Sequence, residues 1–449
     1  MARKPRAVAA VVVFVGSSPG IAAGTQQDGE WTDVTVGPPP ASCWSSWTSD
    51  ELCNPLDTAV QAAVDFTRIS LEAGEYRNRG WSEAAPRAAG LANGWVTSIT
   101  NKKGLIIQAA TPDSKPLLRF DGAGGISIKD SQQITLQGLE IEGPAERITG
   151  AEASDERARL TSRSLNGSTT GQCSRTECAS CSESECGATA DCQYDSANGF
   201  CRGTTLGYFN GRGIAVWAGS SGSSSLCFRQ LAVHHCPASG IRANRANDVV
   251  ISDNLVYDNL WWTTSGESAI VFAESQGYGL MSIARNVVYG NRNFMPFYSP
   301  SLADLPGQTG SNIGHYASWN QDYIIDGSGV YISRNQDFEG TFSLEENTCF
   351  DNGINGVVVH NTDNDLVTVI VERNVVFSNG MTTKDVEQRQ SAGGFVINSG
   401  INVKLWSNTV ATSVDGDYAY QCFNICSIIA GGNNKACVPT EVNAVYNDT

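Results

Sequence analysis

Arginine, tyrosine, histidine and carboxylate side chains occur in this chain at positions where they could act on an acidic sugar. Removing the proton next to a sugar carboxylate needs a cation that neutralises the carboxylate, a base and an acid. Arg334 could supply the cation, and Tyr331 and His360 the base or the acid. Hydrolysis of a glycosidic bond needs a pair of carboxylates instead, for which Glu267 and Asp326 are candidates. We predict these five residues as the catalytic set.

The elements that position these residues come from a repeat. Segments 251–259, 283–291, 344–352 and 371–379 each hold a short alternating apolar strand, an Asn, a second strand and an aromatic residue. A unit of this size cannot bury its own apolar face, so successive copies must stack. We predict that the aligned asparagines form a buried ladder that satisfies the backbone groups of the turns. They are Asn254, Asn286, Asn347, Asn374 and Asn408.

This repeat resembles the right-handed parallel β-helix proteins of the pectate-lyase-like superfold. The resemblance implies an all-β solenoid with three strands in each coil, but it does not select an activity, because the superfold includes lyases, hydrolases, epimerases, esterases, tailspikes and adhesins. It also implies a site on the face of the first strand of each coil, where the enzymes of the superfold usually place theirs. The Trp-x-Asp-His motif of pectate lyases and the Tyr-Gly-Phe-Asp-Pro-His type of motif of mannuronan epimerases are absent.

The first strand of each coil follows a glycine or another small residue, and alternation directs two columns of side chains outward. One column is Ala215, Arg242, Val271, Tyr331, Val358 and Val396, and the other is Trp217, Asn244, Ala273, Ser333, His360 and Asn398. Long connections at 260–267, 292–326 and 380–393 lie beside this face and predict a cleft. The substrate-binding residues that we predict there are Arg242, Asn244, Trp217, Trp261, Trp262, Arg389 and Asn398.

The chain divides into four predicted regions. Residues 1–23 have the basic start, apolar run and small residues of a secretory signal peptide. Residues 24–94 are predicted as an N-terminal cap and first coil, with a short amphipathic capping helix within 54–66. The β-helix follows over 95–415, interrupted by a cysteine-rich insertion at 144–205, and 416–449 form a C-terminal cap or tail. The six cysteines of the insertion favour disulfide bonds over a zinc site in an exported protein.

Composition limits the partners. A net charge of −16 excludes a nucleic-acid partner, because no basic stripe could displace the counterions of the phosphates. Beyond the signal peptide no segment is apolar enough for insertion into a membrane. The sequons at Asn166 and Asn447 fit a secreted glycoprotein in a eukaryotic host. No cofactor is predicted with certainty; Ca²⁺ could bind acidic loop residues such as Asp363 and Asp365, and the metal ligands and oligomeric state stay open.

These observations predict a secreted, carbohydrate-active protein whose partner is a polysaccharide bound in the first-strand cleft. Lyase or epimerase chemistry is favoured over glycoside hydrolysis, because the outward face offers Arg, Tyr and His rather than two facing carboxylates. The alternative is a non-catalytic extracellular protein, namely a polysaccharide-binding, adhesive or cell-wall structural β-helix protein.

Overall fold

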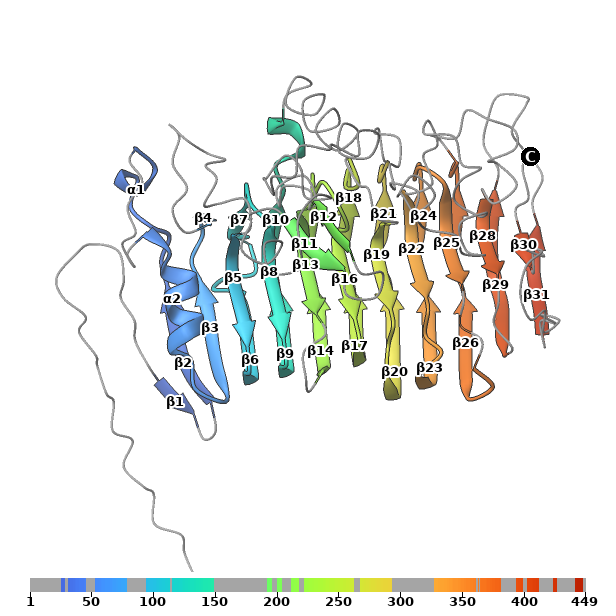
Figure 1. Cartoon of the computed structure of the whole chain (residues 1–449), viewed down its shortest axis with the longest axis horizontal. Helices are drawn as coiled ribbons and strands as arrows, with labels where there is room; N and C mark the ends of the chain where they lie inside the picture. Colours follow the sequence, from blue (N-terminus) through green and yellow to red (C-terminus); the bar gives the residue numbers. More distant parts are fainter. Residues whose placement is uncertain are drawn as a thin grey trace, which may run out of the picture.

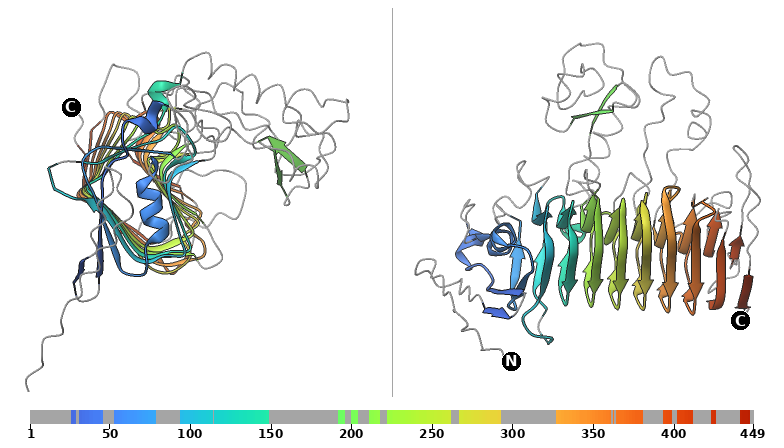
Figure 2. Two further views of the ribbon diagram at one scale, coloured as in Figure 1. Left: turned by 90° about the vertical axis from the view of Figure 1, so that its left-hand side faces the viewer. Right: turned by 90° about the horizontal axis from the view of Figure 1, so that it is seen from below.

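The structure, a computed structural model, is a right-handed parallel β-helix in which successive coils stack along one axis (Figure 1, Figure 2). It describes residues 26–28, 31–45, 53–78, 94–113, 115–148, 192–195, 200–203, 211–217, 222–261, 267–292, 327–360, 362, 364–380, 393–398, 402–411, 423–425 and 441–446. The fold predicted from the repeat is confirmed, because the strands of neighbouring coils pair in parallel at matching positions.

Each complete coil contributes three strands to this stack. The first strands form one sheet: β5 (Trp95–Thr100), β8 (Gly124–Lys129), β13 (Arg212–Trp217), β16 (Ile241–Asn244), β19 (Ser268–Ala273), β22 (Ser328–Ser333), β25 (Asn355–His360), β28 (Gly393–Asn398) and β30 (Phe423–Ile425). The second strands are β2 (Trp31–Val36), β3 (Thr67–Leu71), β6 (Lys103–Ala109), β9 (Gln132–Gln137), β14 (Ser223–Arg229), β17 (Ala246–Ser252), β20 (Gly277–Ala284), β23 (Phe338–Glu345), β26 (Val367–Glu372), β29 (Val403–Ala411) and β31 (Glu441–Tyr446). The third strands are β4 (Glu75–Arg77), β7 (Leu117–Arg119), β10 (Glu140–Glu142), β15 (Ala232–His234), β18 (Leu255–Tyr257), β21 (Val287–Tyr289), β24 (Thr348–Phe350) and β27 (Val375–Phe377). Second strands also occur before residue 95, as β2 and β3, and after residue 415, as β31.

The core lies inside the coils and is made of the inward side chains of all three strands. A glycine corner precedes many first strands, because the chain turns there so sharply that two successive residues face inward. A β-carbon on Gly356 would lie 2.2 Å from Cγ1 of Val376, and one on Gly213 would lie 2.4 Å from Cγ1 of Val233. No larger residue fits these corners without displacing a core valine. The Gly-Ile and Gly-Val pairs of the sequence are therefore a packing requirement.

Two asparagine ladders hold the turns on either side of the third strands. In the predicted ladder, Asn286 donates through Nδ2 to Asn347 Oδ1 (3.0 Å) and to the carbonyl of Ile251 (2.9 Å). Its own Oδ1 accepts from the backbone N–H of Asn254 at 3.0 Å and from Nδ2 of Asn254 at 2.9 Å. The structural role predicted for these asparagines is thus confirmed. A second ladder repeats the pattern with the asparagines that close each repeat: Asn259, Asn291, Asn352 and Asn379.

Replacing Asn286 with aspartate is expected to lower the free energy of unfolding by about 2 kcal/mol at neutral pH. The change keeps the shape but removes both N–H donors, and it sets a carboxylate against Oδ1 of Asn347 in a buried site. Chemical denaturation of the two proteins measures the difference. Asn247→Asp, at a half-buried position outside either ladder, is the control and should shift the midpoint little. Equal midpoints for Asn286→Asp and the unmodified protein would contradict this role.

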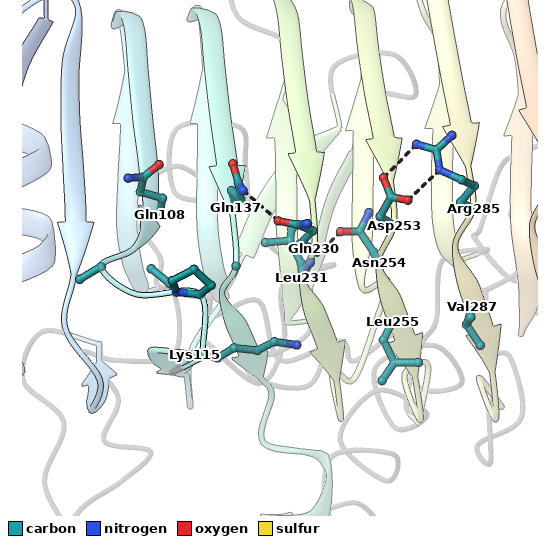
Figure 3. A pocket seen from close by; sticks show the side chains of 14 residues that line it. Gln108, Lys115, Gln137, Gln230, Leu231, Asp253, Asn254, Leu255, Arg285 and Val287 are labelled. Carbon is teal, nitrogen blue, oxygen red and sulfur yellow. Dashed lines mark hydrogen bonds and ion pairs between the residues drawn. The ribbon is translucent and has the colours of Figure 1, made fainter.

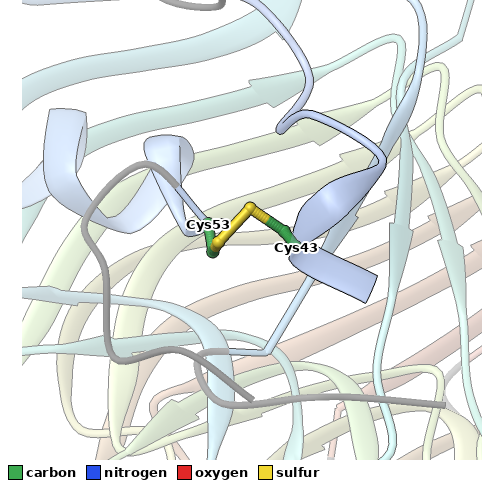
Figure 4. The surroundings of a disulfide bond; sticks show 2 residues. All are labelled: Cys43 and Cys53. Atoms are coloured by element: carbon green, nitrogen blue, oxygen red, sulfur yellow. A yellow bond between two sulfur atoms is a disulfide. The ribbon is translucent and has the colours of Figure 1, made fainter. Parts of the chain in front are cut away.

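The N-terminal end carries the helices α1 (Ser42–Ser45) and α2 (Pro55–Ala62) and the strand β1 (Gln26–Asp28), which pairs antiparallel with β2. Figure 2 shows α2 lying across this end of the stack. Leu56 and Val60 of α2 are buried in the core, and Asp57 accepts hydrogen bonds from Thr97 and Ser98 of β5. A disulfide bond joins Cys43 to Cys53 (Figure 4).

The cysteine-rich insertion is described only at 144–148, which includes η2 (Ala145–Arg147), and at the antiparallel pair β11 (Cys192–Asp195) and β12 (Phe200–Gly203). The disulfides predicted there lie outside the side chains that the structure describes. Within the helix, Cys349 is a buried free thiol, and burial raises its pKa to about 12. No helix in the described ranges is both long and apolar enough to cross a membrane.

Candidate functional site

A cluster of charged side chains lies on the first-strand face around Glu267, at the start of β19. Glu267 is buried and forms ion pairs with Arg212 of β13 and with Arg242 of β16, and it accepts a hydrogen bond from the hydroxyl of Ser239. Burial alone would raise the pKa of this carboxyl, but the two guanidinium groups and the hydroxyl lower it to about 2. Glu267 is therefore an anion throughout the physiological range and cannot donate a proton.

The two arginines of this cluster keep unused hydrogen-bonding capacity. Arg242 Nη1 lies 2.9 Å from Glu267 but is not aligned for a hydrogen bond, and buried Nε of Arg212 has no acceptor in the part of the chain that the structure describes. Arg242 Nε donates to Asn244 at 2.9 Å. The guanidinium of Arg212 lies 5.0 Å from the ring centroid of Trp217. Both unpaired donors are buried inside the cluster, so any ligand would meet the partly exposed edges of these guanidinium groups instead.

Tyr331 and His360 form the second part of the site. Strand register places Tyr331 in the column of Arg242, with Val271 of β19 between them. Neighbouring strands are about 4.8 Å apart, so Tyr331 and Arg242 stand about 10 Å apart along the axis. The rings of Tyr331 and His360 stack with centroids 6.4 Å apart and an angle of 23°. Tyr331 is thus two strands away from Arg242, and His360 is on the strand after that of Tyr331.

A chain of ion pairs follows the ends of the same strands. Glu274, after β19, lies 3.1 Å from Nε of Arg245 and 3.8 Å from Nη1 of Arg334. All three residues have positive φ, between 51° and 56°, because the chain turns immediately after each first strand. The first strands from β13 to β25, with the described residue on either side of each, carry four arginines and two glutamates, Glu267 and Glu274. The net charge of this face is therefore +2. The arginines are Arg212, Arg242, Arg245 and Arg334.

Several predicted residues come together on this face, and others lie outside the described ranges. Glu267, Arg242, Asn244 and Trp217 belong to the charged cluster, and Tyr331 and His360 form the stacked pair. Arg334 is exposed at the strand ends, and Asn398 pairs with His360 through the backbone. Trp261 is half-buried. Asp326, Trp262 and Arg389, and with them most of the predicted walls of the cleft, fall outside the described residues, so the cleft stays a prediction.

Arg212 and Ser239, which complete the cluster, were not among the site residues predicted from the sequence. Each stands immediately before a corner glycine, Gly213 or Gly240, and each turns outward because that glycine faces inward. Strict alternation assigns both residues to the wrong side. The usable signal is a polar residue directly before the glycine of a Gly-Ile pair, as in Arg212-Gly213-Ile214 and Ser239-Gly240-Ile241.

The outward columns of this sheet are also less exposed than a bare sheet surface would be. Val271 and Val396 are 1% exposed and Val358 is 4% exposed, although alternation points all three away from the core. A groove in the described part of the chain lies elsewhere, at the corner between the second and third strands (Figure 3). No group of three or more His, Cys, Asp or Glu side chains converges as a metal site within the described ranges, and the predicted Ca²⁺ ligand Asp363 lies outside them.

The aromatic column of the repeats forms a continuous ring stack on the third strands. Tyr257, Tyr289, Phe350 and Phe377 stack with centroids 4.9–5.2 Å apart, and His234 extends the stack at 4.8 Å. Each ring covers the faces of its neighbours, so these faces are not open to a sugar, and the column has a structural role.

His234 is expected to make the stability of the fold depend on pH. Its Nδ1 lies 2.6 Å from Nδ1 of His235, and its Nε2 lies 3.2 Å from Glu140. Burial and the neighbouring His235 lower the pKa of His234, although Glu140 and Glu142 partly oppose this. Because the folded-state pKa lies below the unfolded one, the unfolded state takes up the proton first. Stability is therefore expected to fall as pH drops through the ordinary histidine range, about pH 7.5 to 5.5.

His234→Phe is expected to flatten this dependence, because phenylalanine keeps the ring stack but does not titrate. Denaturation midpoints at a series of pH values measure the slope for both proteins. An identical slope in the variant would assign the pH dependence to other groups.

Comparison with known proteins gives distant neighbours only. No family model matches the chain, and no curated protein sequence matches it. Among solved structures, the A-module of the Azotobacter vinelandii mannuronan C-5 epimerase AlgE6 has 12% identity and a TM-score of 0.40, covering 82% of this chain and 77% of that one. The DFA-IIIase of Arthrobacter chlorophenolicus A6 has 12% identity and a TM-score of 0.36 (89% and 72% covered). Pectate lyase Pel9A has 11% identity and a TM-score of 0.33 (85% and 73%). The fold therefore rests on the strand pairing of this chain.

Proposed function

We propose that this protein is a secreted, carbohydrate-active enzyme that acts on an acidic polysaccharide at the first-strand face. The observation that carries the proposal is the local excess of two positive charges on a chain with a net charge of −16. A chain this acidic repels a polyanion unless the site reverses the field locally. Ion pairs with Glu267 hold the guanidinium groups of Arg212 and Arg242 at this face, where their charge would attract a sugar carboxylate.

Lyase or epimerase chemistry suits this site better than hydrolysis. Both reactions begin with removal of the proton beside the carboxylate, and a cation on that carboxylate stabilises the charge that develops. Tyr331 and His360 are the groups that exchange protons, and Arg242 and Arg334 are the cations. Glu267 is a positioning residue, because its low pKa and burial suit it to hold Arg212 and Arg242 rather than to protonate a leaving group.

A panel of polysaccharides tests the proposal. The secreted protein is incubated with uronate-containing and neutral polymers, with and without Ca²⁺. Absorbance from unsaturated uronates, reducing ends and deuterium uptake from D₂O at the carbon beside the carboxylate are followed together. Absorbance identifies a lyase, and deuterium uptake without absorbance identifies an epimerase. Both outcomes support the proposal.

Two other outcomes overturn it. New reducing ends without absorbance or deuterium uptake would identify a hydrolase and move the chemistry to a carboxylate pair. Silence in all three assays, with retention of the protein in an affinity gel that contains the polymer, would favour the non-catalytic binding protein. Recovery of the chain from culture medium with its first 23 residues removed tests the secretion that the N-terminal pattern predicts.

A further inference from the structure

A groove on another side of the β-helix has the properties of a separate binding site. It has a volume of about 880 Å³ and follows the corner between the second and third strands across β6, β9, β14, β17 and β20 (Figure 3). The connection after β6, residues 110–116, is longer than the two-residue turn of Asp253 and Asn254 after β17, and it adds Lys115 to the groove wall. Ala109 and Gly138 are small residues at matching positions of neighbouring coils and leave space beside them.

The polar lining follows the period of the coils. Gln108 and Gln137 occupy the same position on neighbouring strands, and Gln230 is on the next coil. Nε2 of Gln137 donates to Oε1 of Gln230 at 2.8 Å, and Oε1 of Gln137 accepts from Arg229 at 3.0 Å. An amide has two N–H donors and an oxygen that can accept twice, so these contacts leave capacity for a ligand. The amides of Gln108 and Gln137 thus stand one strand spacing apart, about 4.8 Å, and Arg229 holds the same position on the next coil.

Charge and apolar surface complete the lining. Arg285 binds Asp253 through two hydrogen bonds, at 2.7 and 2.9 Å. Lys115 is exposed, so the lining carries a net positive charge. Val287, 37% exposed, adds aliphatic surface next to the charged pair. Amides, cations and aliphatic patches match the hydroxyl groups, carboxylates and C–H faces of an acidic sugar chain.

We propose that this groove binds an extended acidic polysaccharide that lies along the helix axis, at a site separate from the first-strand face. A pyranose unit in an extended chain is about as long as the strand spacing, so successive sugars can meet successive coils. A peptide strand fits less well, because the strands here are paired on both sides and leave no backbone edge to extend. The identity of the polymer rests on the proposed function, but binding does not require turnover.

Affinity electrophoresis of the full chain in gels containing polyuronate tests the groove. The double variant Gln137→Ala/Gln230→Ala and the single variant Lys115→Glu are each expected to weaken retention about tenfold, and a neutral polymer in the gel should retain the protein less than polyuronate does. Lys115 lies on an exposed connection, so its charge reversal tests the groove even where the double variant fails to fold. Gln132→Ala, at the exposed start of β9, is the matched control and should bind like the unmodified protein.

The outcomes separate the groove from the catalytic proposal. Weaker retention of both groove variants, with or without turnover by the unmodified protein, supports the groove. Unchanged retention of Lys115→Glu and of a folded double variant overturns it, even if the protein is an active lyase or epimerase. Absence of any retention of the unmodified protein also overturns it.

Discussion

Replacing Glu267 with glutamine is expected to lower the free energy of unfolding by about 3–5 kcal/mol, the usual cost of breaking a buried ion pair from one side. The variant leaves Arg212 and Arg242, both largely buried, against a neutral amide. It also replaces an acceptor of the Ser239 hydroxyl by a group that can present N–H instead. The loss exceeds the value of the pair itself, because uncompensated charges remain in a largely buried site.

Denaturation midpoints of the two proteins measure this cost. The loss of stability as the pH is lowered gives a second, independent test. The pKa of Glu267 is about 2 in the folded protein, below its ordinary value of 4.5, so its contribution is complete above pH 4.5 and is lost as pH falls toward 2. Glu267→Gln should remove this part of the acid dependence.

Glu274→Gln is the matched control for this experiment. It breaks ion pairs of the same type to Arg245 and Arg334 at the exposed strand ends, where about 0.5 kcal/mol is expected. If the two glutamine variants lost equal stability, Glu267 would not be the anchor of the cluster.

The sequence predicted the core of this fold well because the ladder asparagines mark the register of every coil. Once Asn254 and Asn286 are aligned, alternation places Ile251 and Val256 of one coil over Ile283 and Val288 of the next, and all four are buried. A register error of one residue would turn these side chains outward, so the repeat leaves little freedom.

Alternation failed where the backbone departs from a regular strand. At the corner both Gly213 and Ile214 face inward, so Arg212 lies on the outer side. A strict alternation of inward and outward residues predicts the opposite side for it. The alternation pattern also could not predict how exposed an outward residue is, since Val271 points away from the core and is nevertheless buried. The groove depends on the longer connection after β6 and on two small residues, and no motif marks that combination.

Removing either proton-exchanging group of the stacked pair, the Tyr331 hydroxyl or the His360 imidazole, is expected to lower turnover on an acidic polysaccharide by about 10²–10⁴-fold, the usual contribution of a positioned acid or base. Tyr331→Phe keeps the ring against His360 and removes only the hydroxyl, so a structural role of the ring would survive it. His360→Ala removes the other proton-exchanging group. Because neither change alters the arginine cluster across Val271, the loss should appear in kcat with KM nearly unchanged.

Tyr289→Phe provides the control, since Tyr289 also stands in a ring stack but on the third strands, away from the proposed site. Its turnover should equal that of the unmodified protein. Turnover within about threefold of normal in both Tyr331→Phe and His360→Ala would exclude the pair as acid and base. The proton transfers would then have to come from residues nearer to Arg242. A large loss in His360→Ala alone would instead assign both transfers to the imidazole, which can serve as base and then as acid within one elimination.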